Sequence, residues 1–362
     1  LYDLMEKSKE FTPYIFVSKN CSPKENFNYQ KKEELEKIYD FFKNKNMRVL
    51  YAYDFKKDDY IAFSKMPVKP DIIIYCHPWY VYKTQGPVMT STFAISCYIP
   101  YFLATSISPI EYYTRFHRYI TSHYVPSKLI KEYYSKNMVN KGLNVKATGH
   151  PMLDYFYLNK NKNIVSNNTV IYAPHWSVDD NNTLFWGTFL DLGSPILEYA
   201  KKHPEINWVF KPHPCLRNYL LNHKYKTKAE IEKYWADWAK IGSIHETGDY
   251  LDLFMNSKAI ITDCGSFQTE YFMTQKPFIR LKSDHPTPFN EAVEKMASTA
   301  YTVSKEDELI KILYKILIEN KDPKKEERKK VLLELGLDNV YAAKNIVDDI
   351  LSIINKGEEQ NE

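Results

Sequence analysis

The sequence predicts an α/β protein made of two Rossmann-like domains that face a cleft. The chain has 362 residues, enough for about two domains of ordinary size, each with its own core. Short apolar or β-branched runs alternate with helical patterns for most of the length, as in βαβ units with parallel strands. The alternation is interrupted near residue 150 and then restarts. We therefore expect two similar halves whose strand ends share one ligand-binding cleft.

The first predicted domain covers residues 1–150. A helix is expected from Glu34 to Asn46, because apolar residues recur there at helical spacing and would cover one face of the sheet. Six runs predict the strands of this domain: Tyr14–Val17, Val49–Tyr53, Asp71–Tyr75, Ile95–Ile99, Tyr119–Tyr124 and Val145–Thr148.

The second predicted domain covers residues 151–335, after a break at Gly149-His150-Pro151. A polar stretch from Asn159 to Asn168 is typical of a linker. Four strands are predicted in this domain: Val170–Ala173, Trp208–Phe210, Ala259–Thr262 and Pro277–Leu281.

The last segment, residues 336–362, is expected to form a helix that crosses back onto the first domain. Asp338 is the predicted N-cap of this helix. Its apolar stripe would consist of Val340, Ala343, Val347, Ile350, Leu351 and Ile354.

The charge balance argues against a nucleic-acid partner. The chain has 49 Lys+Arg against 45 Asp+Glu, and this net charge of +4 is weak and dispersed. The densest basic run, residues 324–330, is interrupted by two glutamates. It is either a solvated helix face or a contact with an anionic membrane surface.

Cysteine usage and hydropathy indicate the compartment. The five cysteines are scattered and have no CxxC spacing, which argues against a disulfide framework or a zinc cluster and for a reducing environment. No run approaches about 18 consecutive apolar residues, so no transmembrane helix is expected. We expect a cytoplasmic protein, either free or peripheral on the inner face of the cell membrane.

Titratable residues follow four of the best strand candidates. His77 follows the strand that ends at Tyr75, and His175 follows the one that ends at Ala173. Lys211 and His213 follow Phe210, and Asp263 follows Thr262. A single histidine at a strand end is more often a hydrogen-bonded structural residue than a catalyst. Three histidines at strand ends of two facing domains, taken together, favour a functional site.

The tetrapeptide Asp263-Cys264-Gly265-Ser266 has the features of a phosphate cradle. Gly265 would allow a tight turn, and the helix that follows presents unpaired N–H groups and the positive end of its dipole. Ser266 is either a phosphate ligand or only an N-cap. Lys211 could neutralise the same phosphate as a point charge. Glu270 either accepts hydrogen bonds from a ribose or polyol, or is simply solvated.

Several common signatures are absent from the sequence. It contains no GxGxxG, GxxxxGK[ST], GxSxG or HExxH motif, so the nicotinamide-cofactor, P-loop, serine-hydrolase and zinc-protease classes lack support. No Asp-x-Asp pair offers ligands for a metal-chelated diphosphate. We therefore predict no cofactor and no metal. If a nucleotide diphosphate binds here, helix dipole, lysine and histidine would have to stabilise its charge in place of a metal.

The order of these motifs resembles a known family. In the second half the matching stretches are Tyr172-Ala173-Pro174-His175-Trp176-Ser177, Gly187-Thr188-Phe189, Phe210-Lys211-Pro212-His213-Pro214, Ile261 to Phe267, Glu270-Tyr271 and Lys276-Pro277. In the first half the looser matches are Gln85-Gly86-Pro87, Tyr98 to Tyr101 and Thr148 to Pro151. With these stretches the chain resembles the CDP-glycerol glycerophosphotransferases of wall teichoic acid and capsule synthesis, especially the short capsule-locus members.

The resemblance implies a GT-B-like enzyme whose second half holds a CDP-alcohol and whose first half receives the acceptor. Such enzymes transfer an alcohol phosphate, such as glycerol or ribitol phosphate, to a hydroxyl of a glycan or lipid-linked acceptor and release CMP. The implied catalytic residues are His77, His175 and His213. The implied substrate-binding residues are Lys211, Asp263, Cys264, Gly265, Ser266, Phe267, Glu270, Thr188 and Gln85.

One departure from the family pattern concerns the catalytic base. Teichoic acid polymerases carry a His-Gly pair in the first domain, and its histidine is regarded as the base. The corresponding stretch here is either Gln85-Gly86 or Cys76-His77-Pro78. We expect His77 to remove the acceptor proton, while His213, Lys211 and the helix that starts at Ser266 stabilise the diphosphate.

Two other functions fit the same pattern. A GT-B glycosyltransferase that uses a nucleotide sugar would need a similar diphosphate cradle. A non-catalytic glycan-binding protein would use the abundant aromatic residues, 15% of the chain, to bind sugar faces and would not bind CDP.

Overall fold

The structure is a computed structural model that describes residues 1–21, 31–103, 112–160, 168–180, 184–246, 248–338 and 341–359. Two units make up the chain. Unit 1 consists of Leu1–Tyr101, Pro109–Asp154 and Asn339–Glu362, and unit 2 of Phe102–Ser108 and Tyr155–Asp338. The sequence-based domain ranges stay predictions.

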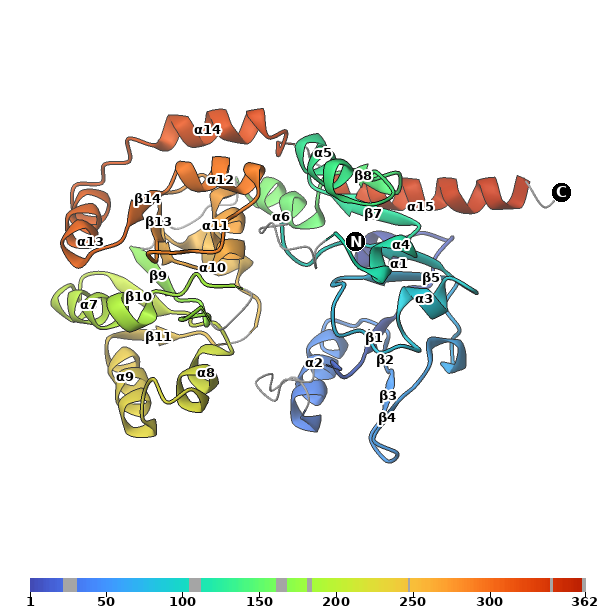
Figure 1. Cartoon of the computed structure of the whole chain (residues 1–362), viewed down its shortest axis with the longest axis horizontal. Helices are drawn as coiled ribbons and strands as arrows, with labels where there is room; N and C mark the ends of the chain where they lie inside the picture. The colour runs from blue at the N-terminus through green and yellow to red at the C-terminus, as the bar shows by residue number, and fades with distance from the viewer. Residues whose placement is uncertain are drawn as a thin grey trace. The chain divides into compact units, whose positions relative to one another are not determined.

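Unit 1 is built on a four-stranded parallel sheet in the order β5-β6-β7-β8 (Figure 1). Its strands are β5 (Ile72–Tyr75), β6 (Ile95–Tyr98), β7 (Ser122–Val125) and β8 (Val145–Ala147). A parallel pair, β1 (Ile15–Val17) with β2 (Val49–Tyr51), and a hairpin, β3 (Tyr53–Asp54) with β4 (Asp59–Tyr60), precede it. Its helices are α1 (Tyr2–Lys7), α2 (Lys32–Lys43), η2 (Phe63–Lys65), α3 (Pro87–Thr90), α4 (Arg115–Arg118), α5 (Lys128–Asn137) and α15 (Ala342–Glu359). Helix α6 (Pro151–Asn159) runs through the unit boundary.

The C-terminal helix α15 packs within unit 1. Val347 and Ile350 of its predicted apolar stripe lie in one buried cluster with Met5, Cys97 and Tyr124, and Ile346, which was not in the predicted stripe, lies there too. The predicted cap is wrong: the backbone N–H groups of Ala342 and Ala343 donate to the carboxylate of Asp154, each at 2.8 Å. Because the cap comes from a distant residue rather than Asp338, local sequence did not indicate it. Val340 lies outside the described residues.

Unit 2 contains a six-stranded parallel sheet in the order β11-β10-β9-β12-β13-β14. The strands are β9 (Thr169–Ala173), β10 (Asn207–Phe210), β11 (Gly242–Ile244), β12 (Ala259–Thr262), β13 (Phe278–Leu281) and β14 (Tyr301–Val303). The helices are α7 (Phe189–Lys202), α8 (Leu216–Asn222), α9 (Lys228–Ile241), α10 (Leu251–Asn256), α11 (Gly265–Phe272), α12 (Glu291–Ser298), α13 (Glu306–Leu313), η4 (Tyr314–Ile318) and α14 (Lys325–Glu334).

The core of unit 2 follows from strand alternation. Val170, Tyr172, Trp208 and Phe210 point to one face, where α7, α9 and α13 pack, while Figure 1 shows α10 and α11 on the other side. The rings of Phe210 and Trp238 stack with centroids 5.1 Å apart. Both faces are therefore covered, as parallel sheets require.

Several predicted elements differ from the structure at their ends. The predicted strand 119–124 begins instead at Ser122, because residues 115–118 form helix α4. The predicted helix 34–46 ends at Lys43, and Asn46 has a left-handed φ of 59°. Asn159, the predicted start of the linker, is the last residue of α6, and linker residues 161–167 lie outside the described part of the chain.

Candidate functional site

The sheet of unit 2 has a topological switch point between β9 and β12. The chain runs from β9 outward to β10 and β11, returns to β12 on the other side of β9, and continues to β13 and β14. In open α/β sheets, ligands bind outside the carboxyl ends of the strands at this point. His175 follows β9, and Asp263 follows β12. Two of the predicted site residues therefore lie where the topology favours a ligand.

Asp263 joins the two segments that flank the switch point. Its Oδ1 accepts the backbone N–H of His175 at 2.6 Å. Its Oδ2 accepts the N–H of Thr188 at 2.6 Å and the Thr188 hydroxyl at 2.9 Å. Burial raises the pKa of Asp263 to about 6 in spite of these bonds, so the carboxyl is ionised at neutral pH. Both carboxylate oxygens of Asp263 therefore accept bonds that fix the segments at His175 and Thr188. The Thr188 hydroxyl takes part in one of these bonds.

His175 is buried and held at Nδ1. Its Nδ1 lies 2.7 Å from the Ser177 hydroxyl and also accepts the Ser177 N–H at 3.3 Å. Burial and the neighbouring His213 lower its pKa well below the usual value for histidine. The ring is therefore neutral at pH 7, and with Nδ1 accepting, the hydrogen-bond network assigns the proton to Nε2.

His213 has the same arrangement on the neighbouring strand end. Its N–H donates to the Pro174 carbonyl at 3.0 Å, which ties the loop after β10 to the loop after β9. Its Nδ1 accepts the Cys215 N–H at 3.1 Å, and its ring centroid lies 5.1 Å from that of His175. Burial and Lys211 lower its pKa to about 3. The site thus contains two adjacent neutral imidazoles that each carry the proton on Nε2.

Lys211 is a buried cation, with 5% of its surface exposed. Its Nζ lies 5.1 Å from the ring centroid of Tyr250 and 5.6 Å from that of Phe267. Burial lowers its pKa, although Cys264 and Glu270 act in the opposite direction. No described residue accepts a hydrogen bond from Nζ within the usual distance, so the ammonium is held by ring faces and is available to an anion.

Glu270 is buried beside this lysine and accepts the Tyr250 hydroxyl at 2.7 Å. Burial raises its pKa to about 8, while Tyr250 and Lys211 favour the ionised form. At neutral pH the carboxyl is therefore mostly protonated and can donate as well as accept a hydrogen bond. The prediction that this residue is simply solvated is wrong.

Replacing Glu270 by glutamine is expected to change how stability depends on pH. Because the folded pKa of about 8 lies above the unfolded value, the wild-type carboxyl stabilises the fold below about pH 4.5 and loses this contribution as pH rises towards 8. Glutamine mimics the protonated form, so E270Q should gain stability relative to wild type between pH 5 and 8.5, by at most about 1.4 kcal/mol per pH unit. Thermal unfolding across this range measures the difference.

The control for this prediction is Glu246→Gln. Glu246 also accepts one hydrogen bond from an aromatic side chain, the Trp235 indole at 2.7 Å, but is exposed. Glu246→Gln shows how much of a stability change comes from altering one carboxylate–aromatic hydrogen bond at an exposed site. A difference between E270Q and wild type that does not change with pH would contradict the prediction.

The start of helix α11 contains the predicted phosphate cradle, with a different role for its glycine. Cys264 is the N-cap and makes no side-chain cap, so Ser266 is not the cap. Burial raises the pKa of the Cys264 thiol to about 11, and its sulfur lies 3.3 Å from the Ser266 hydroxyl. Gly265 is helical, so the expected tight turn is wrong. A Cβ there would lie 2.9 Å from ring atoms of Trp186 and Phe289, which is why the position requires glycine.

Replacing Gly265 by alanine is therefore expected to destabilise unit 2. The methyl group would overlap two rings that are themselves buried, and overpacking of this kind costs about 1–3 kcal/mol. Denaturant unfolding measures the loss. Gly86→Ala is the matched control, because its nearest neighbour to a Cβ is 3.6 Å away. Equal stability of G265A and wild type would contradict the packing argument.

In unit 1, His77 follows β5 and is held in the opposite way from the two histidines of unit 2. Its Nδ1 lies 2.7 Å from the Trp79 carbonyl, which can only accept, so Nδ1 carries the proton. The lone pair of the neutral ring is therefore on Nε2. Burial lowers its pKa, and the bond to Trp79 opposes this. Of the three predicted histidines, His77 alone is held as a base.

Gln85 is saturated by hydrogen bonds within unit 1. Its Nε2 donates to the carbonyls of Ala52 at 2.7 Å and Ile61 at 2.8 Å, and its Oε1 accepts the Ser18 hydroxyl at 2.7 Å. The side chain is 2% exposed. Gln85 thus connects three segments, and its side chain has little remaining capacity for a substrate.

Three residues of the unit 2 site were not predicted to have a role: Ser177, Trp186 and Tyr250. Ser177 lies two positions after His175, a spacing at which a hydroxyl can reach the ring. Trp186 donates its backbone N–H to Ser177, and Tyr250 precedes α10. No local pattern indicates the last two, because their partners are distant in sequence.

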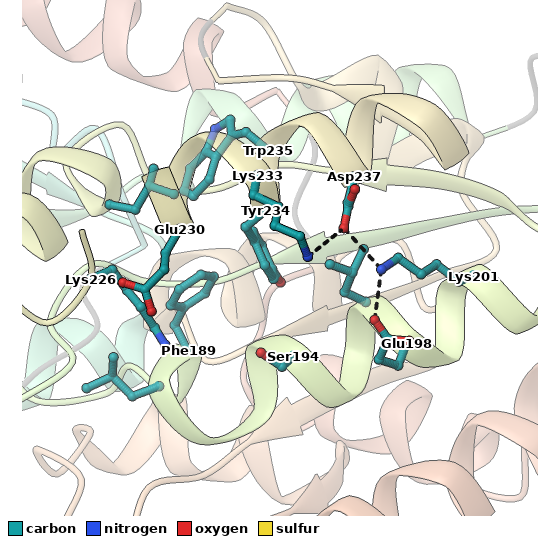
Figure 2. Close-up of a pocket in the computed structure, with 13 residues that line it drawn as sticks. Phe189, Ser194, Glu198, Lys201, Lys226, Glu230, Lys233, Tyr234, Trp235 and Asp237 are labelled. Carbon is teal, nitrogen blue, oxygen red and sulfur yellow. Dashed lines mark hydrogen bonds and ion pairs between the residues drawn. The ribbon is translucent and has the colours of Figure 1, made fainter. Parts of the chain in front are cut away.

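A cavity elsewhere in unit 2 is separate from this site. It lies between α7 and α9 (Figure 2). Its volume is about 230 Å³. Lys201, Lys233 and Asp237 form ion pairs at its wall, and none of the predicted site residues lines it.

Within the described ranges, no cluster of three or more His, Cys, Asp and Glu side chains has the arrangement of a metal site. In the same part of the chain, no helix is long and apolar enough to cross a membrane.

Solved structures with the same fold are enzymes of the GT-B class. The UDP-GlcNAc 2-epimerase of Neisseria meningitidis is 17% identical, with a TM-score of 0.60 over 97% of this chain and 94% of that one. A histidine-to-asparagine variant of the wall teichoic acid polymerase TagF is 14% identical, with a TM-score of 0.59 over 100% and 93%. These similarities confirm the predicted α/β fold with two Rossmann-like halves.

Sequence comparison identifies the family. No curated protein matches the chain. A family model described as CDP-Glycerol:Poly(glycerophosphate) glycerophosphotransferase matches residues 108–352, more than half of the chain, and includes all predicted site residues of unit 2. The predicted resemblance is confirmed: the chain belongs to the CDP-glycerol:poly(glycerophosphate) glycerophosphotransferase family of enzymes.

Proposed function

We propose that this protein transfers an alcohol phosphate from a CDP-alcohol to a hydroxyl of a glycan or lipid-linked acceptor in cell-surface polymer synthesis. The acceptor oxygen attacks the alcohol-bearing phosphorus in line, the bond from that phosphorus to the bridging oxygen breaks, and CMP leaves with the electron pair. The acceptor proton passes to a base. The observation that carries this proposal is the set of N–H donors and the buried ammonium at the switch point of unit 2.

The donor diphosphate is assigned to Lys211, His175, His213 and the start of α11. The lysine supplies the only full positive charge among these groups, and the two imidazoles supply neutral N–H donors. The first N–H groups of α11 add the positive end of a helix dipole. Together they can stabilise the charge that builds on departing CMP.

The ribose or the alcohol is assigned to Glu270. At neutral pH its carboxyl is mostly protonated, so it can exchange hydrogen bonds with hydroxyl groups in both directions. Phe267 and Tyr250 lie beside it, with ring centroids 4.9 Å apart. A hydroxyl-bearing ligand with an apolar ring face fits such surroundings.

The acceptor proton is assigned to His77. Its Nδ1–H bond to Trp79 leaves Nε2 as a lone pair, which is what a general base requires. The side-chain amide of Gln85 is already hydrogen-bonded to the carbonyls of Ala52 and Ile61. We therefore assign Gln85 a structural role and not the role of the base.

Contact with the inner face of a membrane stays a prediction, and the basic run at residues 324–330 gives it little support. Arg328 is fully buried and pairs with Asp322, while Lys324 donates to the carbonyls of Ser298 and Ala300. Lys329 pairs with Glu326. Most of these charges are compensated inside unit 2, so the run is a helix face rather than a free basic patch.

A donor panel tests the proposal. Purified protein is mixed with CDP-glycerol, CDP-ribitol, UDP-, GDP- or CMP-sugars and a polymer acceptor, and the released nucleotide is measured. Release of CMP from a CDP-alcohol with formation of a phosphodiester supports the proposal. Turnover of a nucleotide sugar instead would make the protein a glycosyltransferase.

A thermal shift with CDP separates both enzymes from a glycan-binding protein. CDP at about 100 times its dissociation constant should add roughly 2.7 kcal/mol to stability. Stabilisation by glycan without stabilisation by CDP would favour the non-catalytic alternative. Lys211→Met should remove the CDP effect if the lysine binds the diphosphate.

A further inference from the structure

Ser177 occupies a fixed position between a backbone donor and an imidazole. Its side chain is fully buried. The hydroxyl oxygen accepts the Trp186 N–H at 3.2 Å and lies 2.7 Å from His175 Nδ1. Because the oxygen already accepts one bond and Nδ1 is held as an acceptor by the Ser177 N–H, the hydroxyl proton points at Nδ1.

The backbone around Ser177 leaves it little freedom to move. Its carbonyl accepts the Gly187 N–H at 2.8 Å, and a Cβ on Gly187 would lie 2.8 Å from the same carbonyl oxygen. The next residue, Thr188, is bound by Asp263, which also binds the N–H of His175. The hydrogen bonds of the Ser177 hydroxyl join the segment at His175 to the segment at Trp186. The Asp263 carboxylate fixes both segments.

We propose that Ser177 is a positioning residue that keeps the proton of His175 on Nε2, so that His175 acts on the donor as a neutral hydrogen-bond donor and not as a base. This inference rests on the proposed function, because the donor is the CDP-alcohol assigned to this site. The Ser177 hydroxyl directs its proton at Nδ1, and the tautomer with Nδ1–H would place two protons against each other.

The arrangement gives the site two neighbouring N–H donors without two positive charges. His213 obtains the same tautomer from the Cys215 N–H, and the two rings are 5.1 Å apart. Two imidazolium ions at this distance would repel each other inside a buried site. Neutral donors can bind oxygens of the diphosphate or of the alcohol, while Lys211 provides the charge.

The ring nitrogens of His175 can be observed directly in the protein without substrate. We expect ¹⁵N-histidine NMR spectra of the wild type to show His175 protonated at Nε2 alone from pH 6 to 8. In Ser177→Ala only the longer bond from the backbone N–H, at 3.3 Å, remains at Nδ1, so the form with Nδ1–H should become partly populated, and Ser177→Cys, with its weaker donor, should be intermediate. His175→Gln identifies the His175 signals.

The same variants are then tested with the CDP-alcohol. S177A should lower kcat about tenfold, the scale of one net hydrogen bond, while KM for the donor changes less than twofold. Ser257→Ala is the matched control: it removes a buried hydroxyl that bonds Tyr271 at 2.8 Å in the same unit. It should leave both the His175 spectrum and kcat unchanged.

Either an unchanged His175 spectrum or an unchanged kcat in S177A overturns the inference. Absence of turnover by the wild type with every CDP-alcohol would refute the proposed function. The ring spectra would in that case still decide whether Ser177 sets the tautomer.

Discussion

Replacing His77 by glutamine is expected to lower kcat by about 10² to 10⁴ at neutral pH, the usual contribution of a positioned general base. The Nδ1–H bond to the Trp79 carbonyl leaves the lone pair on Nε2, and glutamine has no group of comparable basicity. CDP should bind as in the wild type, because His77 belongs to unit 1 and the diphosphate is assigned to unit 2. Turnover of CDP-alcohol and calorimetry with CDP measure the two effects separately.

The pH dependence of kcat is a second test of the role of His77. Burial lowers the pKa of His77 below its usual value, so wild-type kcat should fall only below that lowered pKa as the ring becomes protonated. H77Q should lose this acidic limb. His203→Gln replaces a partly exposed histidine that pairs with Glu205; it is the matched control and should retain full activity. Near-normal kcat in H77Q would show that another group is the base.

The sequence predicted the elements that consist of continuous apolar runs. The predicted strands at Val170–Ala173 and Ala259–Thr262 match β9 and β12, whose residues are almost all buried. It missed β11 and β14, which have three residues each at the edges of the sheet, where few neighbours require an apolar run. Edge strands are specified by pairing with the sheet rather than by their own pattern.

The residue types of the site could be predicted, but the bonding of each residue could not. The position after a strand end indicated His175, His213 and Asp263, because parallel strands bring their carboxyl ends to one edge. The Asp263 carboxylate accepts hydrogen bonds from His175 and Thr188, which lie 88 and 75 positions before it in the sequence. No local spacing indicates these bonds. The need for glycine at 265 likewise comes from rings that are distant in sequence.

Tautomers show this limit most clearly. His77, His175 and His213 all follow a strand, so the sequence treats them alike. The structure separates them, because a carbonyl accepts from Nδ1 of His77 while N–H or O–H groups donate to Nδ1 of the other two. The division between a base and two donors therefore rests on the hydrogen bonds at Nδ1 of each ring.

Replacing His213 by alanine should lower kcat by at least about a hundredfold, the scale for losing one donor that stabilises developing charge. The variant removes the Nε2–H group and leaves the Cys215 N–H without its acceptor. Because burial and Lys211 lower the pKa of this ring to about 3, the wild-type ring is neutral, and the loss should be the same from pH 6 to 8. The kcat for a CDP-alcohol measured across this range tests both statements.

Two further variants test whether residue 213 acts as a hydrogen-bond donor or through a positive charge. Glutamine at 213 carries an amide N–H about as far from the backbone as Nε2 of histidine, so H213Q should retain more activity than H213A, and the exposed His223→Ala should retain all of it. If the ring acted as a cation or as the base, H213Q would be as inactive as H213A and the wild-type profile would contain a limb that both variants lack. Near-full activity of H213A would remove His213 from the site altogether. The expected order, with the largest loss for alanine and no change in pH dependence, would assign charge neutralisation to Lys211 and directional hydrogen bonding to His213.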